Sequence, residues 1–117
     1  MAWLILFHDD FVIDFKQFPK NVQKRMLTKL KFLEQFGTEL GRPHVDTLKG
    51  SQYKNMKELR FEIDNGVWRI AFIFDPQRNG ILLVGGNKSG VKEQRFYKQL
   101  IKKADSRYKQ YLKNISQ

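Results

Sequence analysis

Residues 56–84 read MKELRFEIDNGVWRIAFIFDPQRNGILLV, and the alternation and turns in this stretch decide the fold. Residues 56–64 are predicted to form a strand, in which Leu59, Phe61 and Ile63 alternate with Glu58, Arg60 and Glu62. Asn65-Gly66 follows as the strongest short hairpin signal in the chain, because these residue types readily take positive φ. Residues 67–74 and 81–84 are almost wholly apolar, as in covered strands. The stretch therefore predicts three strands in succession.

The flanking sequence supplies one more strand and three helices. An apolar run at residues 3–7 predicts a central strand covered on both faces. Apolar residues recur at helical spacing in residues 11–18, in 19–36 and, over a long distance, in 92–115. Residues 38–55 are expected to form a loop. The order β-α-α-β-β-β-α predicts an α+β fold, with two N-terminal helices and a long C-terminal helix packed on a twisted, mostly antiparallel four-stranded sheet.

Composition indicates one packed domain spanning residues 1–117, because 41% of the residues are hydrophobic and 14% are aromatic. There are 22 Lys and Arg residues against 12 Asp and Glu, a net charge of +10. A charge surplus of this size repels itself, so a polyanionic partner is expected. Nucleic acid fits best, before an acidic protein or an anionic membrane surface, and a merely basic soluble protein is the remaining alternative. Six of the ten net charges belong to residues 92–115.

Several function classes are excluded by what the sequence lacks. It has no cysteine, and therefore no disulfide, thiol nucleophile or thiolate metal site. Two histidines do not make a convincing zinc site, so neither a metal nor a cofactor is expected. The N-terminal apolar run is far shorter than a membrane span and lacks a basic region and a cleavage site. We therefore expect a cytoplasmic protein without a membrane partner.

Polar residues in the strands suggest a site on the sheet. Glu58 and Arg60 are two apart and share one face of their strand. Arg69 interrupts an apolar strand, and a two-residue turn at Asn65-Gly66 would place it opposite Glu62 and diagonal to Arg60. Further basic residues follow the third strand or flank the preceding loop, namely Lys88, Lys49 and Lys54. Such a face would hold several backbone phosphates.

Cleavage of RNA by its own 2′-hydroxyl needs a base, a cation for the developing charge and an acid for the leaving oxygen. Arg60 and Arg69 could clamp the phosphate, since guanidinium binds phosphate in a bidentate manner. The candidates for the base are Glu58, Asp46 and His44, and Tyr97 could be the acid or a base-stacking platform. Other residues expected to bind RNA are Lys49, Lys54, Lys57, Lys92, Arg95 and His44. The alternative is an ordinary ion pair between Arg69 and Glu58 or Glu62, with Tyr97 as a core residue.

The segments RPHVDTLKGS, NMKELR, WRIAFIFDP, ILLVGGNKSG, FYKQLIKKAD and YKQYL, in this order, resemble the RelE/ParE toxin superfamily, in particular its HigB-like, phage Gp49-related branch. The resemblance implies a bacterial or phage toxin that cleaves mRNA in the ribosomal A site without metal or cofactor. It also implies a helix-turn-helix, HigA-like antitoxin in a hetero-oligomeric complex. By position, Arg60 and Arg69 match the paired strand arginines of the family, Lys88 its basic residue after the last strand, and Tyr97 lies near its functional tyrosine.

The chain departs from this family pattern at several points. RelE has a lysine where this chain has Glu58, so a lysine base does not transfer, whereas YoeB-like relatives carry a glutamate near the position of Asp46. The C-terminal helix is longer than in RelE, and fewer basic residues follow the last strand. Two alternatives stay open: a ParE-like inhibitor of DNA gyrase without nuclease activity, and a non-catalytic basic nucleic-acid-binding protein. ParE proteins generally lack the basic cluster, so Arg60, Arg69 and Lys88 together favour the nuclease.

Overall fold

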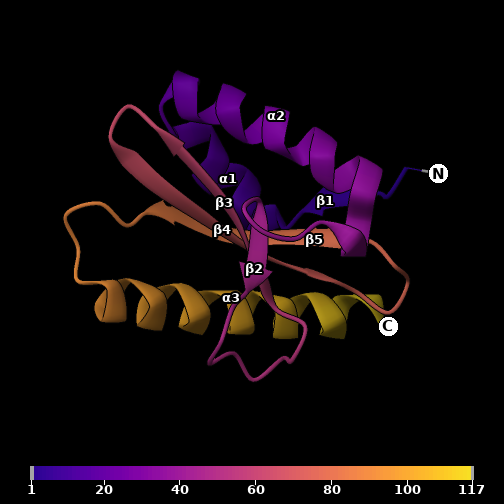
Figure 1. Ribbon diagram of the computed structural model, residues 1–117. Helices are drawn as coiled ribbons and strands as arrows, with labels where there is room; N and C mark the ends of the chain where they lie inside the picture. Colours follow the sequence, from indigo (N-terminus) through magenta and orange to yellow (C-terminus); the bar gives the residue numbers. More distant parts are fainter. Residues whose placement is uncertain (1, 117) are drawn as a thin grey trace.

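A computed structural model describes residues 2–116 and has the predicted α+β architecture (Figure 1). The elements in chain order are β1 (Ile5–Phe7), α1 (Asp9–Gln17), α2 (Lys20–Phe36), a 3-10 turn (Gly37–Glu39), β2 (Val45–Thr47), β3 (Lys57–Ile63), β4 (Gly66–Phe74), β5 (Gly80–Asn87) and α3 (Glu93–Ile115). Helices α1 and α2 cover one face of the sheet, and α3 crosses the other. Two helix layers thus enclose a central sheet.

The sheet has five strands in the order β1-β5-β4-β3-β2, which corrects the expected four. The additional strand is β2, a three-residue segment inside the expected loop that pairs antiparallel with β3. Three residues are too few to show a strand periodicity in the sequence. The expectation of a central first strand was also wrong. Strand β1 lies at the edge, parallel to β5, and its residues are only half-buried because it has one neighbour.

The hairpin between β3 and β4 turns one residue earlier than predicted. Its central residues are Asp64 and Asn65, with φ of 50° and 64°, and Ile63 pairs with Gly66. Positive φ at both central positions matches the twist of the strands, and Asp and Asn tolerate it. Gly66 is needed for another reason, since a Cβ there would lie 2.9 Å from Nε1 of Trp68. The shift changes every cross-strand pair, so Arg69 lies opposite Arg60 and not opposite Glu62.

Each face of the sheet has its own apolar core, and the alternation of β3 explains why. Leu59 and Phe61 point to the core under α1 and α2, which includes Phe11, Met26, Leu33, Ile70 and Phe72. The core under α3 is formed by Met56, Ala71, Ile73, Leu83, Leu100 and Ala104, among others. Glu58 and Arg60 are out of phase with Leu59 and therefore belong to the α3 face. Glu58 consequently meets Tyr97 of α3. Among the described residues, no helix is long and apolar enough to span a membrane.

Candidate active site

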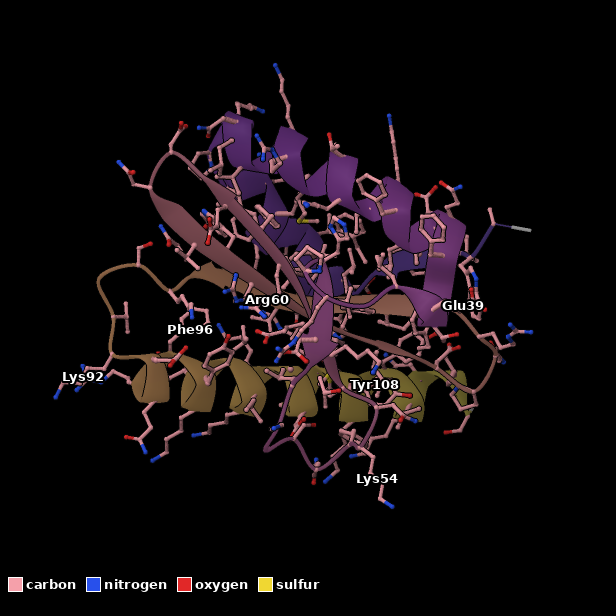
Figure 2. The ribbon with its side chains drawn as sticks, viewed as in Figure 1. Glu39, Lys54, Arg60, Lys92, Phe96 and Tyr108 are labelled. Atoms are coloured by element: carbon pink, nitrogen blue, oxygen red, sulfur yellow. The ribbon has the colours of Figure 1, made fainter. Side chains whose placement is uncertain are left out.

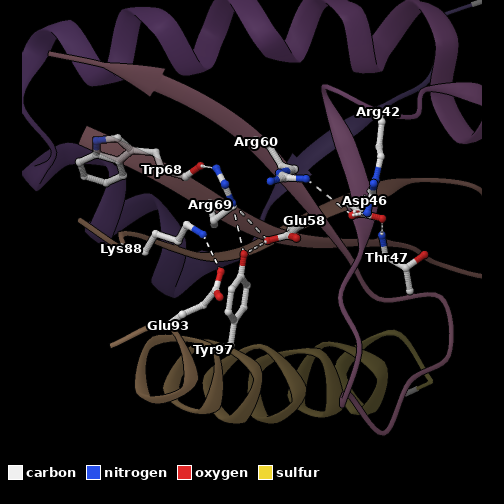
Figure 3. Close-up of polar contacts among 10 residues, drawn as sticks. All are labelled: Arg42, Asp46, Thr47, Glu58, Arg60, Trp68, Arg69, Lys88, Glu93 and Tyr97. Carbon is white, nitrogen blue, oxygen red and sulfur yellow. Dashed lines mark hydrogen bonds and ion pairs between the residues drawn. The ribbon is translucent and has the colours of Figure 1, made fainter. Parts of the chain in front are cut away.

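Glu58, Arg69 and Tyr97 form a hydrogen-bonded cluster between the sheet and α3 (Figure 3). The Tyr97 hydroxyl donates to Oε1 of Glu58 at 2.7 Å, and Nε of Arg69 donates to the Tyr97 hydroxyl at 3.3 Å. Nε of Arg69 also lies 3.5 Å from Oε1 of Glu58. Arg69 is 4% exposed and Glu58 6%, so both charges lie in the interior, where only a partner makes them tolerable. Each charge therefore depends on the other.

The register of β3 and β4 pairs two arginines across the strands. Arg60 and Arg69 are directly opposite, an arrangement that is unfavourable for like charges. Each arginine has its own carboxylate, since NH1 of Arg60 lies 3.6 Å from Oδ2 of Asp46 while Arg69 pairs with Glu58. The side chain of Arg60 remains 31% exposed. Arg60 is thus the accessible member of the pair, and Arg69 is the buried one.

Asp46 is held by a second arginine that the sequence did not single out. Nε and NH2 of Arg42 both donate to Oδ2 of Asp46, at 3.0 and 2.7 Å, and the backbone N–H of Thr47 donates to Oδ1. These hydrogen bonds, the one from Arg42 above all, hold the pKa of the Asp46 carboxyl below its usual range. A carboxylate with a lowered pKa is a weaker base. The geometry makes Asp46 better suited to orient Arg60 than to take a proton.

Tyr97 is held in its protonated form. Burial, and then the hydrogen bond to Glu58, raise the pKa of the Tyr97 hydroxyl, because both disfavour a phenolate. The hydroxyl is therefore a proton donor at neutral pH. Beside it, Nζ of Lys88 lies 5.7 Å from the centre of the Tyr97 ring and donates to Oε1 of Glu93 at 2.8 Å. Lys88 follows the pairing of β5 with β4, which brings it to the first turn of α3.

These groups line a cavity of about 400 Å³. Of the residues that the sequence suggested, six contribute to its lining: Asp46, Lys49, Glu58, Arg60, Lys88 and Tyr97. Arg69 contacts Glu58 and Tyr97 from β4 and completes the cluster. Among residues 2–116, no three histidine, aspartate or glutamate side chains are grouped so that they could hold a metal ion. The chemistry available in the cavity is that of cations, three carboxylates and a phenol.

Other suggested residues lie elsewhere. Lys54 lines a different hollow beside Tyr108, and Lys92 projects outward at the start of α3 (Figure 2). Arg95 lies on α3 and lines the same surface as Lys92. Lys57 lies at the start of β3, opposite Phe72. His44 faces α2, where its ring stacks on Phe32 at 5.1 Å and Nδ1 lies 3.1 Å from Nζ of Lys29. His44 is therefore occupied away from Glu58 and does not line the cavity.

The sequence missed two charged residues of this cavity, Arg42 and Glu93. Arg42 precedes Asp46 by four residues, a spacing that is informative only if the intervening chain turns back, as it does here. Glu93 is five residues after Lys88, and the segment between them is irregular. A spacing of four residues is a helix signal, but residues 42–46 are not helical, and a spacing of five is neither a helix nor a strand signal. Both pairs depend on loop geometry.

Residues 13–109 match the family described as phage derived protein Gp49-like. The chain belongs to the Gp49-like family. Two proteins of Mycobacterium tuberculosis (strain ATCC 25618 / H37Rv) are similar to this Gp49-like protein, "Putative toxin HigB2" and "Putative toxin HigB3". Both are 45% identical to it, over 84 and 83 residues, and each alignment covers 71% of the chain. The aligned part spans 41% of HigB2 and 70% of HigB3.

The Gp49-like protein also resembles a solved structure of the E. coli toxin RelE, a mutant in the free state. The TM-score is 0.59 at 11% identity, with 86% of the chain and 95% of RelE covered. At this identity the likeness concerns the fold alone. Together, the family match and these relatives confirm the resemblance to the RelE/HigB-like toxin superfamily.

Proposed function

We propose that this protein is the toxin of a type II toxin–antitoxin pair and a ribosome-dependent mRNA endonuclease. The observation that carries the proposal is the Glu58–Tyr97 hydrogen bond at the wall of a cavity that Arg60 also lines. A carboxylate, a protonated phenol and an accessible guanidinium supply a base, an acid and a phosphate ligand. Membership of a family with HigB relatives supports the toxin role.

The reaction we assign to the cavity uses the RNA's own nucleophile. Glu58 takes the proton of a 2′-hydroxyl, the 2′-oxygen attacks the adjacent phosphorus, and the bond from phosphorus to the 5′-oxygen breaks. The products are a 2′,3′-cyclic phosphate and a 5′-hydroxyl, whose proton comes from Tyr97. The proton on Glu58 then passes to the Tyr97 phenolate along their 2.7 Å contact, which restores both groups. No metal enters these steps.

The cations have separate roles in this scheme. Arg60, with its partly exposed side chain, binds the scissile phosphate and offsets its developing charge. Arg69 is a positioning residue that pairs with Glu58 and donates a hydrogen bond to the Tyr97 hydroxyl. Lys88 adds positive charge at the rim of the cavity beside Tyr97. Asp46 orients Arg60 and is the second candidate for the base.

The basic outer surface of α3 suits a large anionic partner. Glu93 is paired with Lys88, and Asp105 accepts hydrogen bonds from Ser51 and Gln52, so both acidic residues of the helix are engaged within the chain. The outer surface of its first half is lined by Lys92, Gln94, Arg95, Lys98, Gln99 and Lys102. We assign this basic surface to the RNA-rich ribosome, with an acidic face of a HigA-like helix-turn-helix antitoxin as the alternative.

One observation favours the non-catalytic alternative. Glu58 and Arg69 are buried and satisfied by each other, as in a structural ion pair. The test is cleavage of mRNA on programmed ribosomes by the wild type and by Arg60→Ala and Glu58→Gln, with folding checked by circular dichroism. Efficient cleavage by the wild type that both variants lose supports the proposal. Unchanged cleavage in both variants, equal cleavage of free RNA, or inhibition of gyrase without mRNA loss would contradict it.

The antitoxin has a test of its own. The neighbouring gene should encode a small helix-turn-helix protein, and its product should copurify with this chain and stop cleavage. A neighbour that neither binds the chain nor relieves growth inhibition would argue against a toxin–antitoxin pair.

A further inference from the structure

A second basic groove, of about 510 Å³, adjoins the candidate active site. It lies between α2, which contributes Arg25 and Lys29, and the part of β3 that includes Glu62. Arg42 and Arg60 line both this groove and the cavity that contains Glu58 and Tyr97. In Figure 3, Arg60 is seen between α2 above it and Tyr97 below it. The two hollows therefore share these two arginines in their walls.

The positive charge of the groove is only partly neutralised within the chain, because Arg42 and Arg60 pair with Asp46 and Arg69 pairs with Glu58. Its lining contains five cations, Arg25, Lys29, Arg42, Arg60 and Arg69, and one carboxylate, that of Glu62. Among residues 2–116, no carboxylate lies within ion-pair distance of Arg25 or Lys29. NH1 of Arg25 donates to the Glu62 carbonyl at 3.4 Å, a long contact, and Nζ of Lys29 lies beside the His44 ring. These two cations remain available for an anion.

We propose that this groove binds backbone phosphates of the RNA strand that flank the bond held at Arg60. The inference rests on the proposed function only in identifying the bound strand as the one that is cleaved. Cations from α2 and from the loop before β2 converge on a channel that begins at the reacting phosphate. A strand leaving the cavity past Arg42 would next meet Lys29 and Arg25.

An acidic protein segment fits the groove less well. Protein interfaces depend on aromatic or aliphatic anchors that enter apolar pockets. The apolar lining here is limited to Pro43 and Phe61, and Phe61 is 4% exposed and belongs to the core. A phosphate backbone needs no such anchor, since arginine and lysine side chains are sufficient to hold it.

The test measures binding without cleavage, with RNA oligonucleotides whose 2′-hydroxyls are all methylated, of about four and about twelve nucleotides. The variant is Arg25→Ala with Lys29→Ala. The matched control is Lys24→Ala with Lys31→Ala, which removes the same charge from exposed positions of α2 outside the groove. The wild type and the control should bind the longer oligonucleotide more tightly than the shorter one. The groove variant should bind the longer one about tenfold more weakly than the wild type, with a salt slope smaller by about 1.4, and the shorter one equally well.

Equal binding of the longer oligonucleotide by the wild type and the groove variant, or equal losses in the groove variant and the control, would overturn the inference. Unchanged RNA binding together with loss of the antitoxin would identify the groove as a protein site and would overturn it too. Cleavage on programmed ribosomes is measured separately. If the wild type cleaves no mRNA while the length-dependent difference persists, the proposed function fails and the groove assignment stands.

Discussion

The Tyr97 hydroxyl donates to Glu58 at 2.7 Å and joins α3 to β3 across 39 positions of the sequence. Tyr97→Phe removes this donor and keeps the ring. In the proposed reaction the leaving oxygen then lacks its acid, so kcat for mRNA cleavage on ribosomes should fall by about 10²–10³-fold. Tyr108→Phe, farther along α3 and outside the cavity, is the control and should cleave normally. Normal cleavage by Tyr97→Phe would leave the tyrosine with a structural role.

Replacing the carboxylate with an amide should change the cleavage rate differently at the two candidate bases. Glu58→Gln should lower the single-turnover rate by about 10²–10⁴-fold, because it removes the proposed base without changing the size of the side chain. Asp46→Asn should have a smaller effect, since the pKa of Asp46 is already lowered by Arg42 and its main contact is with the arginines. Rates measured across the pH range would check both. A larger loss in Asp46→Asn would transfer the role of base to Asp46.

Arg69→Ala is expected to destabilise the fold as well as to abolish activity. It leaves the buried Glu58 without its cation, and breaking a buried pair in this way costs about 3–5 kcal/mol. The free energy of unfolding, measured by denaturant titration, should show this loss. Arg60→Ala, at the exposed position opposite, should change it much less. Similar small losses in both variants would mean that the pair is not buried in solution.

Alkaline pH should destabilise the protein through Tyr111. Burial and the hydrogen bond from its hydroxyl to Asp75 raise the pKa of Tyr111 to about 12, above the ordinary value of 10. The folded state therefore keeps a proton that the unfolded state loses first. The stabilisation is complete below pH 10 and is lost as the pH rises through about 12. Tyr111→Phe should reduce this dependence, measured as unfolding free energy against pH, and remove one late step from the ultraviolet titration of the tyrosines.

Much of the fold could be predicted from local patterns. The alternation in residues 57–63 and the three-four spacing along α3 give the elements and their inward faces, and both patterns were confirmed. The same period of two placed Glu58 and Arg60 on one face. Strand β2 could not be predicted, because a segment of three residues carries no period.

The predicted cross-strand partner of Arg69 was wrong because the prediction placed the turn one residue late. Both Asp64-Asn65 and Asn65-Gly66 are acceptable turn pairs by residue type. The close approach of the Trp68 ring to Gly66 belongs to the folded hairpin and is not visible in the sequence. A shift of one residue in the turn replaced an opposite charge with a like charge across from Arg69.

The sequence by itself determined the order of the helices and of the strands other than β2, the basic charge and the residue types that could act on RNA. These properties are local, because they depend on neighbours a few positions apart. The tertiary structure decided that Tyr97 donates to Glu58, that Asp46 pairs with both Arg42 and Arg60, and that His44 faces α2. Such contacts depend on how α3 and the loop before β2 pack against the sheet. Packing is fixed by the shapes of both apolar cores together, which no short stretch of sequence contains.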